Sequence, residues 1–241
     1  MPNVPTTLEN TIAQAKDAVK LALANGQKRL QVELVIPEIA LQAQSLALQF
    51  AYSLNEYGFG LKVLFVDTGA AALARRDWGE TSFKVTDLGS RLTSVETKIS
   101  DDDQIFLIVC PSAVEVAAIE KLCALVEDRP VILLIPQLED VSVVGIGYAA
   151  RQLRERFLST LSTCYFIKPL EFGAIILFSY GELWQVYLEK GETYELIAET
   201  PEKPIGEALD TILNRTPEKV VKTKKINILG DLQKFLRALS Q

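Results

Sequence analysis

Short apolar runs alternate along most of this chain with longer stretches in which apolar residues recur every three or four positions. Such runs are typical of buried strands, and such stretches of amphipathic helices. The pattern predicts strands at 30–37, 61–67, 83–85, 105–111 and 131–138, and helices at 6–25, 38–57, 70–77, 113–127 and 147–161. Strands that are apolar on both faces indicate a mainly parallel sheet. We therefore expect an α/β fold with a Rossmann-like sheet and helices on both of its faces.

The pattern changes after residue 161, where four strand-like segments follow one another without intervening helices. They are predicted at 164–170, 174–180, 183–189 and 193–199, with a helix at 204–213 after them. Short turns rich in Gly and Glu separate the last three, which is typical of an antiparallel meander. We expect one α/β domain over residues 1–213, with the meander and its helix at 162–213.

Residues 214–241 differ from the rest of the chain in charge. They carry seven basic and two acidic side chains, a net charge of +5, whereas the whole chain has a net charge of −6. The pattern predicts a basic linker and then an amphipathic helix at 229–239 with one apolar stripe. The linker is a solvated segment or one that meets an anionic surface or an acidic partner. The helix folds back onto the body, or binds a partner groove or a membrane surface.

Composition excludes several kinds of chemistry. The 241 residues include no histidine, which removes Ser-His-Asp and Cys-His catalysis. The acidic net charge argues against nucleic-acid binding, which depends on Lys and Arg. The three cysteines, Cys110, Cys123 and Cys164, form no metal-ligand or disulfide pattern and are interpreted as small buried side chains. We predict no metal and no cofactor, and consider an enzymatic activity less probable than a binding role.

Two segments suggest a site for a phosphorylated ligand or nucleotide. Asp67-Thr68-Gly69 follows a strand, where open α/β sheets bind ligands, although Asp67 can equally cap the next helix. The segment at 145–150 matches GxGxxA but begins well after its strand, which is also typical of a flexible loop. The candidate ligand-binding residues are Asp67, Thr68, Gly69, Gly145, Gly147 and Arg151.

Other segments suggest protein contacts. Arg75, Arg76 and Trp78 combine residue types that dominate protein interfaces, and Arg151 and Arg154 open a helix as an anion site or a solvated face. We take these five residues as the candidate partner-binding set. The aromatic residues Trp184, Tyr187 and Tyr194 form either a packed face or a docking surface, and Asp101–Asp103 are interpreted as a solvated turn.

Several stretches resemble a family first catalogued as a domain of unknown function, with members in cyanobacteria and plastids. They are VVGIGYAARQLRERFL (143–158), WQVYLE (184–189), YELIAE (194–199), KPIGE (203–207), AALARRDW (71–78) and PQLED (136–140). The resemblance spans roughly residues 5–213. The family includes plant proteins of the low photosystem II accumulation type and a copy fused behind a plastid adenylate kinase.

The resemblance implies an auxiliary, non-catalytic factor in photosystem II assembly or maintenance. The expected partners are the core antenna protein CP-forty-three of photosystem II or its assembly intermediates. The first twenty residues do not read as a signal or transit peptide, and no apolar run is long enough to span a membrane. We therefore expect a cytoplasmic protein with at most peripheral contact at the cytoplasmic face of the thylakoid membrane. The alternative is a small-molecule-binding module or an enzyme of unknown reaction.

Overall fold

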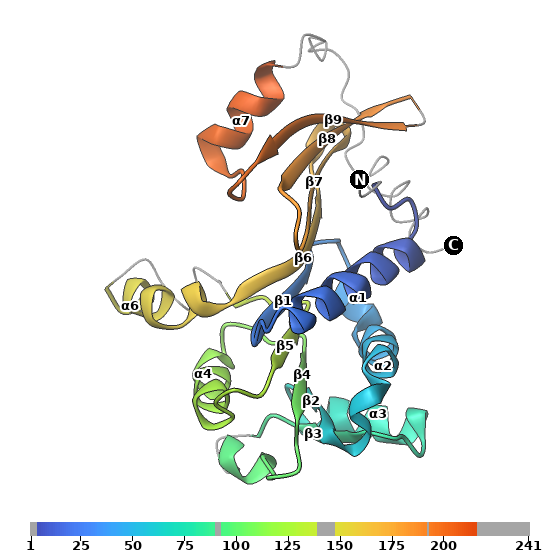
Figure 1. Cartoon of the computed structure of the whole chain (residues 1–241), viewed down its shortest axis with the longest axis vertical. Coiled ribbons are helices and arrows are strands. Elements are labelled where there is room, and N and C mark those ends of the chain that lie inside the picture. The colour runs from blue at the N-terminus through green and yellow to red at the C-terminus, as the bar shows by residue number, and fades with distance from the viewer. Residues whose placement is uncertain (1–3, 90–92, 139–147, 192, 216–241) are drawn as a thin grey trace. The chain divides into compact units, whose positions relative to one another are not determined.

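The computed structural model describes residues 4–89, 93–138, 148–191 and 193–215 (Figure 1). The chain divides into two compact units. We call residues 19–33 and 38–163 the parallel-sheet unit, and residues 1–18, 34–37 and 164–241 the meander unit. The tail predicted as a basic linker and amphipathic helix lies outside the described residues from 216 onward, as do Gly145 and Gly147.

Strands and helices alternate as the apolar pattern predicts. In chain order the elements are α1 (Leu8–Ala24), β1 (Arg29–Leu34), η1 (Ile39–Gln42), α2 (Ala43–Ser53), η2 (Asn55–Gly60), β2 (Leu61–Phe65), α3 (Thr68–Trp78), β3 (Lys84–Asp87), η3 (Val95–Lys98), β4 (Ile105–Val109), α4 (Val116–Leu125) and β5 (Val131–Leu134). Then follow α6 (Tyr148–Arg156), η4 (Leu158–Thr160), β6 (Ser162–Pro169), η5 (Glu171–Gly173), β7 (Ala174–Ser179), β8 (Trp184–Lys190), β9 (Thr193–Thr200) and α7 (Gly206–Arg215).

The strands of the parallel-sheet unit pair in the order β3-β2-β4-β5-β1, and each of these pairs is parallel. β2, β4 and β5 are buried along their whole length, which explains their nearly continuous apolar sequence. Opposite faces of the sheet carry different helices (Figure 1). α4 packs into a core with Leu64, Ile108 and Leu133, whereas Trp78 of α3 contacts Phe65 on the other face. The predicted α/β class with helices on both faces is confirmed.

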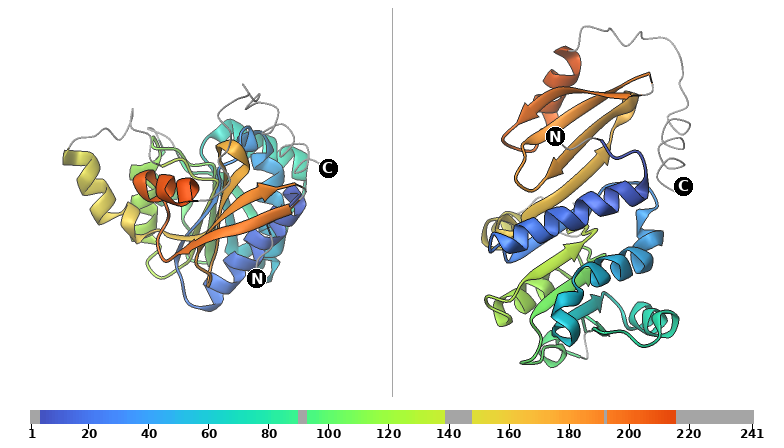
Figure 2. Two further views of the ribbon diagram at one scale, coloured as in Figure 1. Left: turned by 90° about the horizontal axis from the view of Figure 1, so that it is seen from above. Right: turned by 45° about the vertical axis from the view of Figure 1, so that its right-hand side comes forward.

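The meander unit is built on β6, β7, β8 and β9, which pair in this order and antiparallel. On one face, Phe166 and Trp184 form a buried cluster against which Leu209 of α7 packs. Figure 2 shows α7 lying against these strands. On the other face, the hydroxyl of buried Tyr165 donates to the side chain of Gln14 in α1 over 3.0 Å. The predicted meander is therefore confirmed.

Trp184 is packed rather than available for docking, because its ring stacks on Phe178 with centroids 4.6 Å apart. Tyr187 is also buried, and its odd spacing from Trp184 places it on the opposite face of β8. These two members of the predicted aromatic set therefore belong to two layers of the meander core and do not form one surface.

The helix predicted at 38–57 is broken into three pieces. Glu38 has a φ of 61° and precedes the short helix η1, α2 ends at Ser53, and Gly58 interrupts η2 with a φ of 50°. The positive φ of Glu38 delays the start of the helix to Ile39, and Leu54, with φ −111° and ψ 22°, leaves helical geometry after Ser53. The apolar pattern alone does not reveal these interruptions, because buried residues continue at helical spacing through them.

Candidate functional site

The carboxyl ends of β2 and β4 form a topological switch point. The connection after β2 leads through α3 to β3, and the connection after β4 leads through α4 to β5. β3 and β5 lie on opposite sides of the β2–β4 pair, so the two connections leave the sheet in opposite directions. Open α/β sheets bind their ligands at such a point. The loops after β2 and β4 are therefore the candidate ligand site of this sheet.

The loop after β2 is used to begin a helix. Asp67 has extended backbone geometry, and its side chain accepts a hydrogen bond of 2.9 Å from the amide of Ala70. A side chain on Gly69 would meet Asp67 Oδ1 at 3.0 Å, so glycine leaves room for the capping carboxylate. Of the two interpretations of Asp67, the structure shows the cap.

The loop after β4 is closed in a similar way. Glu115 accepts hydrogen bonds from both the amide and the hydroxyl of Ser112, at 2.8 and 2.7 Å, and the Ser112 hydroxyl accepts from Val114. These contacts close a turn over residues 112–115 immediately before α4, and the Glu115 side chain makes no cap hydrogen bond to the helix itself. An internal carboxylate therefore stands at the start of both helices that leave the switch point. Such a carboxylate competes with an anionic ligand for the same amides.

Two residues beside these loops have unusual backbone geometry. Cys110 follows β4 and Ile135 follows β5, and both have a φ of 51°. For a β-branched residue this is a true outlier, with a cost of about 1–3 kcal/mol. Strand-like hydrogen bonds hold both residues in place, since Cys110 donates to the carbonyl of Leu134 and Ile135 donates to that of Val32. The carboxyl edge is thus strained at two adjacent strands.

The thiol of Cys110 is not a ready nucleophile. Burial raises its pKa to about 11, and burial likewise raises the pKa of the Cys123 thiol to about 11. Both thiols are therefore neutral near pH 7, and a neutral thiol reacts slowly. Cys123 and Cys164 are buried, as the sequence predicts, whereas Cys110 is half-buried. All three are free thiols.

The candidate ligand-binding residues come from separate parts of the unit. Asp67, Thr68 and Gly69 share one loop at the start of α3. Arg151 is exposed on α6, a helix that packs through Leu153 into the core containing α4. The two remaining glycines of the set lie outside the described residues. The structure thus describes four residues of the proposed crevice, three at the start of α3 and one on α6.

The candidate partner-binding residues of α3 have partners within the chain. Arg75 donates to the carbonyl of Val85 over 3.2 Å, and Arg76 pairs with Asp77, which also accepts from Gln44. Arg76 nevertheless keeps 73% of its side chain exposed. Arg154 is exposed on α6, whose Arg156 makes a two-pronged ion pair with Glu120 of α4.

Trp78 is half-buried and belongs to an aromatic group at the end of α3. Its ring centroid lies 5.7 Å from that of Phe65 and 6.0 Å from that of Phe83. Tyr52 of α2 contacts the same Phe83 ring at 5.9 Å and is 53% exposed. Tyr52 is not recognisable as a member of this group from the sequence, because α2 and α3 are brought together only by the fold.

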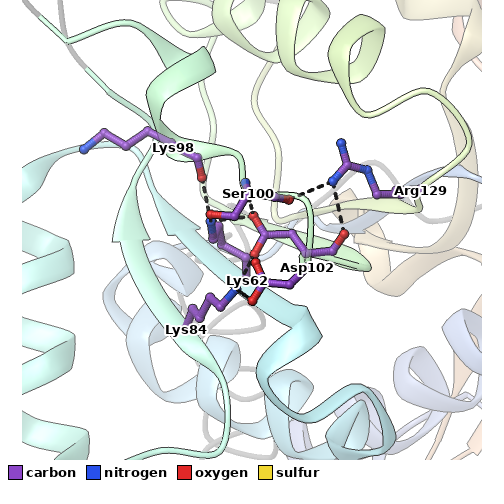
Figure 3. Close-up of polar contacts among 7 residues, drawn as sticks. Lys62, Lys84, Lys98, Ser100, Asp102 and Arg129 are labelled. Atoms are coloured by element: carbon purple, nitrogen blue, oxygen red, sulfur yellow. Dashed lines mark hydrogen bonds and ion pairs between the residues drawn. The ribbon is translucent and has the colours of Figure 1, made fainter.

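The amino ends of the strands hold a buried ion network that the sequence analysis missed (Figure 3). Asp103 is 1% exposed, so its interpretation as part of a solvated turn is wrong. Its carboxylate lies 2.5 Å from the ammonium of Lys62 in β2 and 2.8 Å from that of Lys84 in β3. The amide of Ser100 donates to the same carboxylate over 2.8 Å.

The backbone around Asp103 completes the network. Lys62 also donates to the carbonyl of Lys98 over 2.7 Å, and Lys84 pairs with Asp102 at 2.6 Å. Arg129, which precedes β5, donates to the carbonyls of Ser100 and Asp103, as Figure 3 shows. Ion pairs and hydrogen bonds thereby link the amino ends of four neighbouring strands, β3, β2, β4 and β5. The sequence signal that could have revealed the ion pair between Lys62 and Asp103 is the lysine within the apolar run of β2, since a buried lysine needs an anionic partner.

Parallel strands, helices on both faces and a switch point define an open-sheet α/β protein. The chain belongs to the family described as a domain of unknown function (DUF1995), which matches residues 5–211. The resemblance of the sequence to a family catalogued as a domain of unknown function is thus confirmed. No solved structure shows significant similarity to the chain.

Two kinds of feature are absent from the residues that the structure describes. No helix among them combines the length and apolarity required to cross a membrane. In the same part of the chain, no three His, Cys, Asp or Glu side chains are grouped so that they could hold a metal ion.

Proposed function

We propose that this protein is an auxiliary factor that works by binding another protein, and that its partner is a component of photosystem II during assembly or maintenance. The observation that carries the binding role is the surface formed by Tyr52, Arg75, Arg76 and Trp78, which we call the Arg–aromatic surface. The photosystem context comes from the resemblance of the sequence to the low photosystem II accumulation proteins. The site of action in this proposal is the cytoplasmic face of the thylakoid membrane.

The Arg–aromatic surface has the physical properties of a binding hot spot. Trp, Tyr and Arg contribute most to protein interfaces, and rings held in place lose little entropy on binding. Trp78 and Tyr52 are held by their contacts with Phe83 and still present part of each ring. The exposed pair between Arg76 and Asp77 contributes little to stability, so the guanidinium can exchange its partner at low cost.

A copurification experiment tests this proposal. The tagged chain is expressed in a cyanobacterium, thylakoids are solubilised gently, and the proteins recovered with the tag are quantified. The test variant is Tyr52→Ala combined with Arg76→Ala, which keeps the packed Trp78. The matched control is Phe172→Ala combined with Lys168→Ala, which removes an exposed aromatic residue and an exposed cation from the meander unit.

We expect photosystem II subunits to copurify with the wild-type chain and with the control, and their recovery to fall at least tenfold with the test variant. If a folded test variant recovers as much of the photosystem II subunits as the wild type, the Arg–aromatic surface is not the binding site. If no photosystem II subunits are recovered with the wild type, photosystem II is not the partner.

The switch point supports a second candidate, a module that binds a phosphorylated small molecule between the loops after β2 and β4. A thermal-shift screen over nucleotides and sugar phosphates tests it. A ligand at 100 times its dissociation constant stabilises the folded state by about 2.7 kcal/mol. The carboxylates of Asp67 and Glu115 already accept hydrogen bonds from amides of these two loops, which counts against an anion here. A stabilising ligand whose effect disappears in Ser112→Ala would establish the site, and the absence of any shift would reject it.

A further inference from the structure

On one face of the meander, an ammonium group lies against three aromatic rings, Phe166, Phe178 and Trp184, which we call the aromatic cluster. The rings of Phe166 and Trp184 meet edge to face, inclined by 60° with centroids 5.2 Å apart, and Phe178 stacks on Trp184. The Nζ atom of Lys203 lies 3.9 Å from the centroid of the Phe166 ring and 5.4 Å from that of the Trp184 ring. Both distances are within the range of about 6 Å over which a cation is attracted to a ring face.

The contact between Lys203 and the rings is partly shielded from water. Lys203 is half-buried, and Phe166 is only 2% exposed. Burial of a cation costs free energy unless a partner compensates, and the face of an aromatic ring carries negative potential. The attraction between a cation and a ring also increases as the contact loses water. The aromatic cluster therefore has the composition and the geometry of a site for an ammonium group.

Lys203 lies in the connection between β9 and α7. The connection comprises residues 201–205, because β9 ends at Thr200 and α7 begins at Gly206. Pro204, the next residue along the chain, is buried. The rings that Lys203 contacts belong to β6 and β8, so the contact joins the connection to the middle of the sheet just before the helix begins.

α7 itself is attached to the sheet by few apolar contacts. In residues 206–214 of this helix none is buried, and Leu209, Ile212 and Leu213 are half-buried. Leu209 packs against the aromatic cluster. A helix of ten residues is marginal in water without tertiary contacts, and a segment with few buried contacts opens at low cost. The position of α7 therefore depends on the contacts of the connection that precedes it.

We propose that the aromatic cluster is a binding site for an ammonium group and that Lys203 is its internal occupant. The contact acts as a latch, which holds residues 201–205 and α7 against the meander. When the ammonium of Lys203 leaves the rings, the connection is released and α7 separates from the sheet. The faces of Phe166 and Trp184 then become accessible to an ammonium group of another molecule.

Hydrogen–deuterium exchange of the full-length protein tests the latch. The test variant is Lys203→Met, which keeps a long apolar side chain and removes the charge. Lys203→Arg keeps a cation that can lie against ring faces. Lys168→Met is the matched control, because Lys168 is an exposed lysine of β6 in the same unit. Peptides covering residues 205–213 report the opening of α7.

Occupation by an added cation tests the ammonium site itself. Lys203→Ala removes the internal occupant, and tetramethylammonium chloride is the probe, compared with sodium chloride at the same concentration. These samples also carry Trp78→Phe, so that Trp184 is the one remaining tryptophan and its fluorescence reports on the aromatic cluster. The same titration of Trp78→Phe with Lys203 in place is the control.

We expect residues 205–213 to exchange about three- to thirtyfold faster in Lys203→Met than in the wild type, and at nearly the wild-type rate in Lys203→Arg and Lys168→Met. Wild-type exchange in Lys203→Met overturns the latch, as does equally fast exchange in Lys168→Met.

We expect tetramethylammonium to change the Trp184 fluorescence saturably in Lys203→Ala and to leave it unchanged where Lys203 is present. Absence of a saturable change in Lys203→Ala overturns the ammonium site. An equal change in both proteins overturns the assignment of Lys203 as its occupant.

Discussion

The ion pair between Lys62 and Asp103 allows a sharp test of what stabilises the parallel-sheet unit. The change is Asp103→Asn, which keeps the size of the side chain and removes its charge. Lys62 has 7% of its side chain exposed and would lose its carboxylate partner while remaining buried. Its other contacts are the carbonyl of Lys98 and, at 3.5 Å, the hydroxyl of Ser100. Neither carries a charge that balances the ammonium.

The magnitude follows from the burial of the pair. Breaking a buried ion pair by removing one partner costs about 3–5 kcal/mol, because the remaining charge is desolvated without compensation. Lys84 keeps Asp102 as a partner, so the penalty concentrates on Lys62. For a chain of this size each kcal/mol shifts the melting temperature by roughly 2–4 °C. We expect Asp103→Asn to lower the melting temperature by roughly 6–20 °C.

Chemical denaturation followed by circular dichroism, together with a thermal melt, measures the effect. Asp101→Asn is the matched control, because Asp101 lies in the same turn and is exposed. Lys62→Met alone should cost less than Asp103→Asn, because Asp103 keeps Lys84 and the Ser100 amide. The double variant should cost less than the sum of the two single changes. If Asp103→Asn is no more destabilising than Asp101→Asn, the network does not contribute as argued.

Three further results are expected. Asp67→Ala removes the cap of α3 and should lower the free energy of unfolding by about 1 kcal/mol in urea titrations. Asp67→Ser, which can also cap the helix, should lose much less. Equal losses in the two variants would show that the cap does not stabilise the helix. Cys110 and Cys123, with pKa values of about 11 against an ordinary 9.0, hold about 100-fold less thiolate at pH 8. Peptide mapping after brief iodoacetamide treatment should show them largely unmodified, and rapid alkylation would contradict this. Burial opposes ionisation of Asp87, but its hydrogen bonds and ion pair with Lys98 outweigh burial and lower its pKa. The lowered pKa stabilises the fold above the ordinary pKa of Asp, and this contribution is lost as pH falls through the native pKa. The difference in melting temperature between wild type and Asp87→Asn should therefore shrink from pH 6 to pH 3, and a constant difference would refute it.

Apolar periodicity predicted the strands and the change to a meander because the burial of one or both faces of a strand determines which of its own residues are apolar. Each strand can therefore be recognised without reference to the others. β4 and β5 are recognisable from their own residues, since every position in them is buried. The same reasoning failed at Asp103. Whether a carboxylate in a polar turn is solvated or buried depends on where Lys62 and Arg129 lie, and these residues are remote in sequence.

The candidate site was predictable only in part, for a related reason. Asp67 could be placed at a helix start from its position after an apolar run, and the structure confirms the cap. Tyr52 could not be joined to Trp78, because the link is the Phe83 ring, supplied by a third segment. Positive φ at Ile135 has no sequence signal at all, since β-branched residues favour the opposite.

The amino ends and the carboxyl ends of the parallel strands contribute differently: the amino ends to stability and the carboxyl ends to binding. The charges at the two ends indicate why. At the amino ends, the charges of Lys62 and Lys84 are balanced by those of Asp103 and Asp102 in a largely buried network, so little net charge remains to attract a ligand. At the carboxyl edge, strained backbone at Cys110 and Ile135 lies beside loops that diverge to opposite faces. Strain persists only where the surrounding structure enforces it, and it collects where function requires a fixed geometry. Substitutions at the amino ends of the strands should therefore change stability, and partner recovery should remain intact as long as the variant is folded. A substitution that impairs binding without loss of stability should instead lie at the carboxyl ends of the strands or on the Arg–aromatic surface.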